Sequence, residues 1–220
     1  MMNYDWSVVW RNADVLWEGT KVTVFLAVTT MAIAIPGGIV LALMRLSRIR
    51  ALSIGSALFV EFFRNLPLIL VVYTAYYILP VATGLRFSPV ATAIVALSLN
   101  VSAYNGETFR GGIASIRQGQ SEAGYALGMS RFRVMIDVIL PQAVWRVLPV
   151  LASTWVSLFK DTSLVSVISV GDLAFESMRV RSQTFRVLEM LTAMAVIYWM
   201  LGYPQAKLVD WVNNRYRVSE

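Results

Sequence analysis

Long apolar segments that alternate with short charged ones dominate the pattern of this chain. Five such segments are each about 17 to 25 residues long, and about 20 apolar residues in a helix cross the ~30 Å hydrocarbon core of a bilayer. We therefore predict an all-α integral membrane protein with five transmembrane helices. The predicted spans cover residues 20–44, 57–80, 88–110, 146–170 and 187–209, within one domain over residues 1–220.

Basic residues follow the first predicted span and surround the segment between the third and fourth. Loops rich in Lys and Arg tend to stay on the cytoplasmic side of a membrane. This places the N-terminus outside, the segment between spans three and four inside, and the basic C-terminus with Arg215 and Arg217 inside. The N-terminal segment contains Trp6, Trp10 and Trp17, and is either an interfacial segment or an irregular lead-in.

Two of the predicted spans contain residues that disturb a simple apolar helix. Pro36, Gly37 and Gly38 lie near the middle of the first span and predict either a bend or a close approach of a neighbouring helix. Glu61 and Arg64 are three residues apart at the start of the second span. We interpret them as a pair whose charged ends reach the membrane interface.

The fourth apolar segment is interrupted near its centre by Lys160 and Asp161. A charge at mid-bilayer costs about 2.5–3.5 kcal/mol on insertion scales, so such residues usually face protein or water and mark a transport path. Together with Ser153, Thr154 and Ser157 they recur at helical spacing. We predict a polar stripe that faces a substrate, with helix-to-helix packing as the alternative.

A polar island at residues 121–128 separates the third and fourth apolar segments. Ser121 is a candidate N-cap, and Gly128 can adopt the left-handed conformation that often ends a helix. Ser130 is a candidate N-cap for a second helix that we expect to stop before Pro141. This second helix is predicted to place apolar residues on one side, namely Phe132, Met135, Ile136 and Ile139.

The polar island resembles the coupling loop of ABC import permeases. The family pattern is Glu-Ala-Ala, three residues, Gly, nine residues, an aliphatic residue, one residue and Leu-Pro. Positions in register with this pattern are Glu122, Ala123, Gly128, Leu140 and Pro141, while Gly124 replaces the usual Ala and Val138 a frequent Ile. Glu61, Arg64 and Pro67 also resemble the start of the second span in polar amino acid permeases.

The resemblance covers residues 19–207 and implies a type I ABC importer permease, a multi-pass protein of the bacterial inner membrane with a periplasmic N-terminus and a cytoplasmic C-terminus. It implies a cytoplasmic two-helix coupling loop at residues 115–142. It also implies two ATP-binding cassette subunits, a second permease that is identical or paralogous, and a periplasmic amino-acid-binding protein. The residues expected to contact the ATPase are Glu122, Ala123, Gly124, Ala126, Leu127 and Gly128, with the small ones allowing close approach.

The expected solute is a polar amino acid, and the opening residues 4–6 with residues 119–130 look most like the glutamate/aspartate import permeases. Members that carry cationic solutes have an acidic residue where this chain has Thr154. The predicted solute site comprises Asn100, Thr154, Ser157, Lys160 and Asp161. Alternatives are a permease of the same type for glutamine, histidine or arginine, and an ATP-independent channel or membrane scaffold.

Composition excludes several kinds of chemistry for this chain. It has no cysteine and no histidine, which removes the commonest zinc ligands and acid/base groups, and no Gly-rich phosphate loop for ATP. We therefore predict a non-enzymatic subunit that carries no cofactor or metal, with ATP bound by partner subunits. The formal net charge of +6 reflects membrane orientation rather than nucleic-acid binding.

Overall fold

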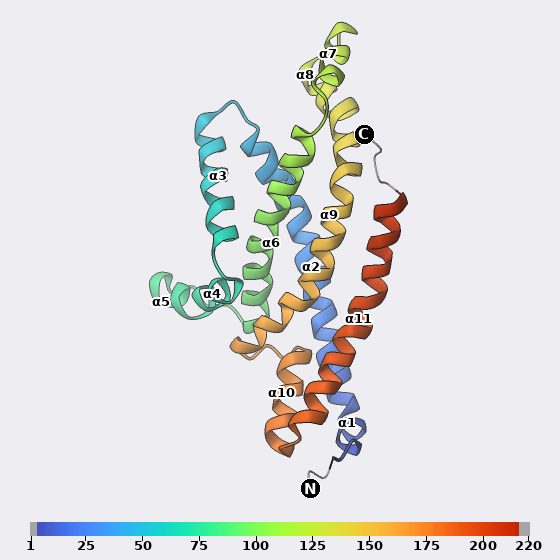
Figure 1. The fold of residues 1–220 in the computed structure, drawn as a ribbon. Coiled ribbons are helices and arrows are strands. Elements are labelled where there is room, and N and C mark those ends of the chain that lie inside the picture. The colour runs from blue at the N-terminus through green and yellow to red at the C-terminus, as the bar shows by residue number, and fades with distance from the viewer. Residues whose placement is uncertain (1–3, 216–220) are drawn as a thin grey trace.

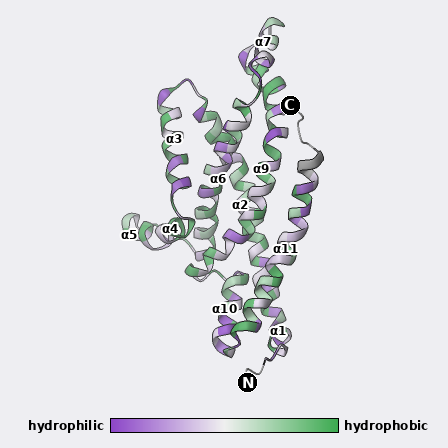
Figure 2. Cartoon of the chain, viewed as in Figure 1, coloured by the Kyte–Doolittle hydropathy of each residue, from purple (hydrophilic) through white to green (hydrophobic). Residues whose placement is uncertain are grey.

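The fold is a bundle of helices that run along one long axis, as the computed structural model shows (Figure 1). The structure describes residues 4–215, with side chains up to Trp211, and no strand occurs in that range. Arg217 and the side chain of Arg215, on which part of the predicted orientation rests, lie outside it. Figure 2 shows hydrophobic residues along the length of the bundle, with hydrophilic ones among them in α3 and α6.

The chain begins with the short helix α1 (Ser7–Arg11) and the long helix α2 (Ala13–Arg45). Helix α2 runs through Pro36 without interruption. A Cβ atom at Gly38 would lie 2.6 Å from Cβ of Asn105 on α6 (Pro89–Ala114). Of the two outcomes predicted for Pro36 and its glycines, the structure therefore shows the close approach of a neighbouring helix.

The second apolar segment does not form one straight helix, and the span predicted over residues 57–80 stays a prediction. Helix α3 (Arg50–Asn65) ends before Pro67, and the chain turns by 108° before it continues as α4. The crosswise segment consists of α4 (Leu68–Tyr73), the π-helix η1 (Thr74–Ile78) and α5 (Leu79–Thr83). Figure 1 shows it lying across the bundle axis.

Between α6 and α9 lie the helices of the predicted coupling loop: α7 (Gln118–Ala126), α8 (Arg131–Arg133) and the π-helix η2 (Val134–Ile139). Helix α9 (Leu140–Asp161) continues directly from η2, so the predicted stop before Pro141 is wrong. The wider π-helical turns come immediately before this proline, which cannot donate a backbone hydrogen bond. A 3₁₀ helix, η3 (Thr162–Ile168), follows α9.

Helix α10 (Leu173–Thr184) and helix α11 (Val187–Arg215) complete the chain. The N-terminal segment packs on them, since Val8 and Leu16 share a hydrophobic cluster with Leu173, Val180 and Met190. The three tryptophans of that segment remain exposed. Figure 1 shows α1 and α10 at one end of the bundle and α7 and α8 at the other.

Three helices in the described part are long and apolar enough to cross a membrane: Ala13–Arg45, Arg131–Ile168 and Val187–Trp211. A fourth is added if α3 and the crosswise segment count as one bent span. Helix α6 has the length for a span but carries polar residues that are buried against its neighbours, among them Asn100, Ser102 and Asn105. The count of five spans therefore stays a prediction.

Candidate coupling loop and transport site

Helix α7 ends in a Schellman motif centred on Gly128. Gly128 has a φ of 74°, its amide donates to the carbonyl of Tyr125 at 3.0 Å, and the amide of Met129 donates to that of Gly124 at 3.1 Å. The left-handed turn predicted at Gly128 is therefore confirmed. The predicted N-cap is wrong, because α7 begins at Gln118 and Ser121 lies inside it.

The second arm of the loop starts as predicted but packs differently. The Ser130 hydroxyl accepts from the amide of Arg133 at 3.4 Å, which confirms Ser130 as the N-cap. The predicted single apolar side is wrong: Phe132 is 73% exposed and Ile136 42%, whereas Val134 and Ile139 are buried. The π-helical turns of η2 change the angular spacing of side chains, so a count based on 3.6 residues per turn assigns the wrong face.

The two arms pack against each other through Gly124 and Val134. A Cβ atom at Gly124 would lie 2.8 Å from Cγ2 of Val134, so the small residue serves the interior of the loop. Glu122, Ala123, Ala126 and Leu127 are exposed, with Leu127 at 82%. The accessible surface thus comprises the expected coupling residues except the buried Gly124.

Sequence reasoning missed two aromatic residues on the surface of this loop. Tyr125 is 47% exposed, and Phe132 was assigned to an apolar packing face. Both residues lie within four positions of Gly128 in the sequence, and this closeness to the turn could have indicated that they are exposed. An apolar, exposed tip at one end of the molecule is the kind of surface that a protein partner covers.

Side-chain bonds fix the base of the loop. The guanidinium of Arg146 on α9 donates to the carbonyl of Ser115 at 2.5 Å and to its hydroxyl at 3.1 Å. The amide of Gln142 donates to the side-chain oxygen of Gln120 at 3.1 Å. These bonds join the end of α6 and the start of α7 to the start of α9.

The predicted polar stripe lies on one side of α9. Ser157 and Lys160 are exposed and Asp161 is half-buried, while Val147, Leu151 and Leu158 are buried. Within the described residues, no opposite charge lies within 4.0 Å of Lys160 or of Asp161. The hydroxyls of Ser153 and Thr154 donate to carbonyls of their own helix, each at 3.1 Å, which leaves their oxygens as acceptors.

Asn100 does not donate to this stripe. Its side-chain amide donates to the carbonyl of Phe63 on α3 at 2.9 Å, and the residue is 6% exposed. Glu61 and Arg64 are both exposed and form no ion pair within 4.0 Å in the described structure, so their place at the membrane interface stays a prediction. The Arg64 guanidinium carbon instead lies 5.5 Å from the ring centroid of Tyr104.

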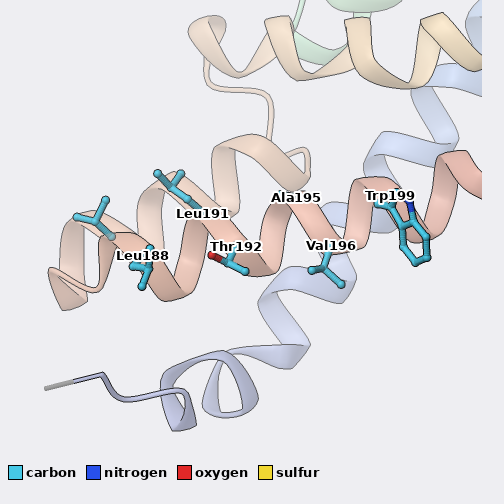
Figure 3. A pocket seen from close by; sticks show the side chains of 7 residues that line it. Leu188, Leu191, Thr192, Ala195, Val196 and Trp199 are labelled. Atoms are coloured by element: carbon cyan, nitrogen blue, oxygen red, sulfur yellow. The ribbon is translucent and has the colours of Figure 1, made fainter. Parts of the chain in front are cut away.

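An open groove of about 660 Å³ follows the outside of α11. Figure 3 shows the side chains that line it, from Leu188 to Trp199 along one helix. Thr192 is its only polar lining residue and none is charged. The groove therefore does not suit a polar solute. Within residues 4–211 no group of three Asp or Glu side chains could hold a metal ion.

The model of the family described as "Binding-protein-dependent transport system inner membrane component" matches residues 34–218. The chain belongs to this family. It is a membrane component of an ABC importer, a family whose members work with ATPase subunits and a substrate-binding protein, and it is therefore a transport component.

Curated relatives cover nearly the whole chain. The glutamine transport system permease protein GlnP of Escherichia coli strain K12 is 36% identical over 99% of this chain and 100% of its own length. The glutamate/aspartate import permease protein GltK of Escherichia coli O6:H1 is 33% identical over 98% of this chain and 99% of its own length. The arginine transport system permease protein ArtQ of Bacillus subtilis strain 168 is 34% identical over 91% of each chain.

Solved structures support the same fold. The crystal structure of an amino acid ABC transporter with histidines superposes with a TM-score of 0.91, at 29% identity, over 97% of this chain and 100% of that one. An inward-facing structure of the MetNI methionine ABC transporter has a TM-score of 0.69 at 19% identity, over 95% of this chain and 99% of that one. The second similarity concerns the fold alone.

Proposed function

We propose that this chain is the permease subunit of an ATP-driven importer for a polar amino acid, with glutamate or aspartate as the first candidates. The observation that carries the proposal is the loop of residues 115–142. It is a hairpin capped at Gly128 and tied to α6 and α9, and its exposed tip lies at one end of the bundle. Such a loop gives a separate ATPase a defined surface to hold.

The proposed assembly contains two ATP-binding cassette subunits, a second permease and a periplasmic amino-acid-binding protein. Helix α7 sits in a groove of the ATPase and contacts it through Glu122, Ala126 and Leu127. When the ATPases close on ATP, α6 and α9 tilt as levers and expose the solute path to the other side. The basic residues at the loop end favour its cytoplasmic position, with the N-terminus in the periplasm.

The proposed solute site uses the polar stripe of α9. Lys160 and Asp161 complement the carboxylate and the ammonium group of an α-amino acid, and the Ser157 hydroxyl adds a hydrogen bond. The Thr154 oxygen is a further acceptor. Asn100 remains a predicted ligand with its free amide oxygen, because its amide nitrogen already donates to Phe63.

Relatives do not select one solute, because the names of three with 33–36% identity state glutamine, glutamate/aspartate and arginine. The absence of an acidic residue at Thr154 favours an acidic or neutral solute over arginine. Uptake of labelled glutamate in a strain that carries only this system, in competition with each unlabelled amino acid, tests this. Stronger competition by arginine or histidine than by aspartate contradicts the proposed solute.

Two substitutions test the coupling role. Glu122→Lys and Gly128→Leu should each lower solute-dependent ATP hydrolysis of the reconstituted complex about tenfold, because the first reverses a charge at the ATPase surface and the second strains the left-handed turn. Gly119→Leu is the matched control, since nothing lies within 4 Å of its Cβ position. Full ATPase coupling in both variants, with the complex assembled, rejects the lever assignment.

One substitution tests the solute site, and one omission tests the channel alternative. Asp161→Ala should reduce uptake at least about tenfold through a higher KM, while the protein still inserts in the membrane. Unchanged uptake kinetics would make Asp161 a structural residue. Uptake that persists in liposomes without the ATPase would instead support an ATP-independent channel.

A further inference from the structure

The carbonyls of Phe63 and Arg64 are among the last four of α3, which have no donors within the helix because the chain turns before α4. In a continuous helix the carbonyl of Phe63 accepts from the amide of residue 67, and Pro67 has no amide hydrogen. The carbonyl of Arg64 would accept from Leu68, which already begins α4 after the chain has turned. Leu66, at the end of α3, has the extended conformation expected before a proline.

Helix α6 supplies a donor to each of these two carbonyls. The side-chain amide of Asn100 donates to the Phe63 carbonyl at 2.9 Å, and the Tyr104 hydroxyl donates to the Arg64 carbonyl at 3.3 Å. Asn100 and Tyr104 are four residues apart, so they lie one turn apart on the same face of α6. The Arg64 guanidinium above the Tyr104 ring adds a third contact at the same place. Two successive donors of one helix thus replace two successive amides of another.

The two bonds from Asn100 and Tyr104 lie between the coupling loop and the crosswise segment. From Tyr104, α6 continues to the loop that we propose the ATPase holds, where its end is bonded to Arg146. On the other side, α4 packs on η3, which directly follows Asp161; Val71 and Val72 of α4 share the buried core with Ile168. A movement of α6 therefore acts on the turn before the crosswise segment through these side-chain bonds.

We propose that Asn100 and Tyr104 are positioning residues that set the angle between α3 and the crosswise segment, and that carry the movement of α6 to that segment during transport. The proposed role in carrying movement during transport rests on the proposed function. The proposed role in setting the angle between α3 and the crosswise segment does not. Carbonyl groups within a bilayer need a hydrogen-bond donor from the protein. Loss of either donor should therefore let the turn between α3 and α4 adopt other conformations. Neither residue needs to touch the solute for this role.

The absence of cysteine permits site-specific spin labels without a background. We suggest labels at Leu58→Cys on α3 and Val81→Cys on α5, which are 63% and 88% exposed. Pulsed electron–electron double resonance on the complete complex in lipid nanodiscs gives the distance distribution between them. Samples with a single label per chain identify distances between permease copies.

The variants are Asn100→Leu and Tyr104→Phe, and the matched control is Ser98→Ala, whose buried hydroxyl on α6 has no partner among the described residues.

We expect the distance distribution without nucleotide to be at least about twice as broad in Asn100→Leu, intermediate in Tyr104→Phe and unchanged in Ser98→Ala. In reconstituted complexes, solute moved per ATP should fall several-fold in Tyr104→Phe, which lies outside the proposed solute site, with an unchanged KM for the solute. Distributions as narrow as wild type in both variants overturn the proposal. So does a raised KM with an unchanged distribution, because Asn100 would then act as a solute ligand. If Asn100→Leu does not assemble, the width in Tyr104→Phe decides.

Pro67→Ala provides an independent check, since it restores an amide that can bond to the Phe63 carbonyl. If Asn100 acts through that carbonyl, adding Asn100→Leu to Pro67→Ala should broaden the distribution less than it does in wild type. Independent effects contradict a shared bond. A wild-type complex without ATP-dependent transport refutes the proposed function, but the nucleotide-free widths still test the angle.

Discussion

Helices α2 and α3 both meet a proline within an apolar segment, but only one of them continues. Helix α2 runs through Pro36, whereas α3 ends before Pro67 and the chain turns by 108°. The difference lies in what α6 presents to each. Helix α6 lies so close to α2 that only glycine fits at positions 37 and 38. Beside α3, it places two hydrogen-bond donors, Asn100 and Tyr104. In this chain, the proline at which the helix ends is therefore the one whose freed carbonyl finds a donor on α6.

Helix α2 is fixed along its length by close contacts. A Cβ atom at Gly37 would lie 2.5 Å from the Ser102 hydroxyl oxygen, and one at Gly19 would lie 3.0 Å from the Asp172 carbonyl oxygen. The Thr23 hydroxyl also accepts from the amide of Leu173 at 3.1 Å. Helix α3 has no comparable glycine contact, since nothing lies within 4 Å of the Cβ position of Gly55. Helix α2 is thus held by close contacts at its glycines, and α3 is not.

The largest expected effect comes from filling the contact between α2 and α6. Gly38→Leu should lower the free energy of unfolding by about 3 kcal/mol, the upper end of the range for overpacking, because its Cβ alone would lie 2.6 Å from Cβ of Asn105. Gly55→Leu on α3 is the control and should change stability little. The check is thermal unfolding of the purified proteins in detergent. Equal losses in both variants would remove the distinction between the two helices.

A smaller, pH-dependent effect is expected where the N-terminal half of α2 meets α10. Asp172 caps α10 by accepting from the amide of Phe175 at 2.9 Å, and burial raises the pKa of its carboxyl from 3.8 to about 6. The folded state therefore binds this proton more tightly than the unfolded state. Its contribution to stability is complete below about pH 4 and is lost as the pH rises through 6.

Asp172→Asn retains an N-cap acceptor and removes this titration. Relative to wild type, the variant should gain about 2–3 kcal/mol of unfolding free energy between pH 4 and pH 7, because a shift of one pKa unit corresponds to about 1.4 kcal/mol. Unfolding by denaturant at pH 4.5, 5.5 and 7 measures the difference. A difference that does not change with pH would contradict burial as the cause of the raised pKa.

The smallest effect is expected from Pro36→Ala. The substitution restores one helical amide and adds freedom to the unfolded chain, so its net effect on stability should stay within about 1 kcal/mol. Transport and the distance between α3 and α5 should match wild type, in contrast to Pro67→Ala. ATP changes the distance between α3 and α5 in the wild-type complex if the crosswise segment moves. If Pro36→Ala alters that change, α2 also acts as a hinge.

Features that depend on a few neighbouring residues could be predicted from the sequence. The left-handed turn at Gly128 and the N-cap at Ser130 are local, and both are confirmed. The polar side of α9 follows from regular helical spacing. The same reasoning gave wrong results for Ser121, because the start of a helix depends on more than one candidate cap, and for Phe132, because π-helical turns shift the apolar face.

The sequence by itself determined an apolar helical protein, the capped hairpin between two long helices, and its membership of a family of importers. Only the tertiary structure decided that the second apolar segment bends, that Gly124 packs inside the loop, and that Asn100 bonds to a backbone carbonyl. The physical reason is the range of the interactions. Caps and helical periodicity act within a few residues, whereas a carbonyl freed at Phe63 finds its donor 37 residues further along the chain.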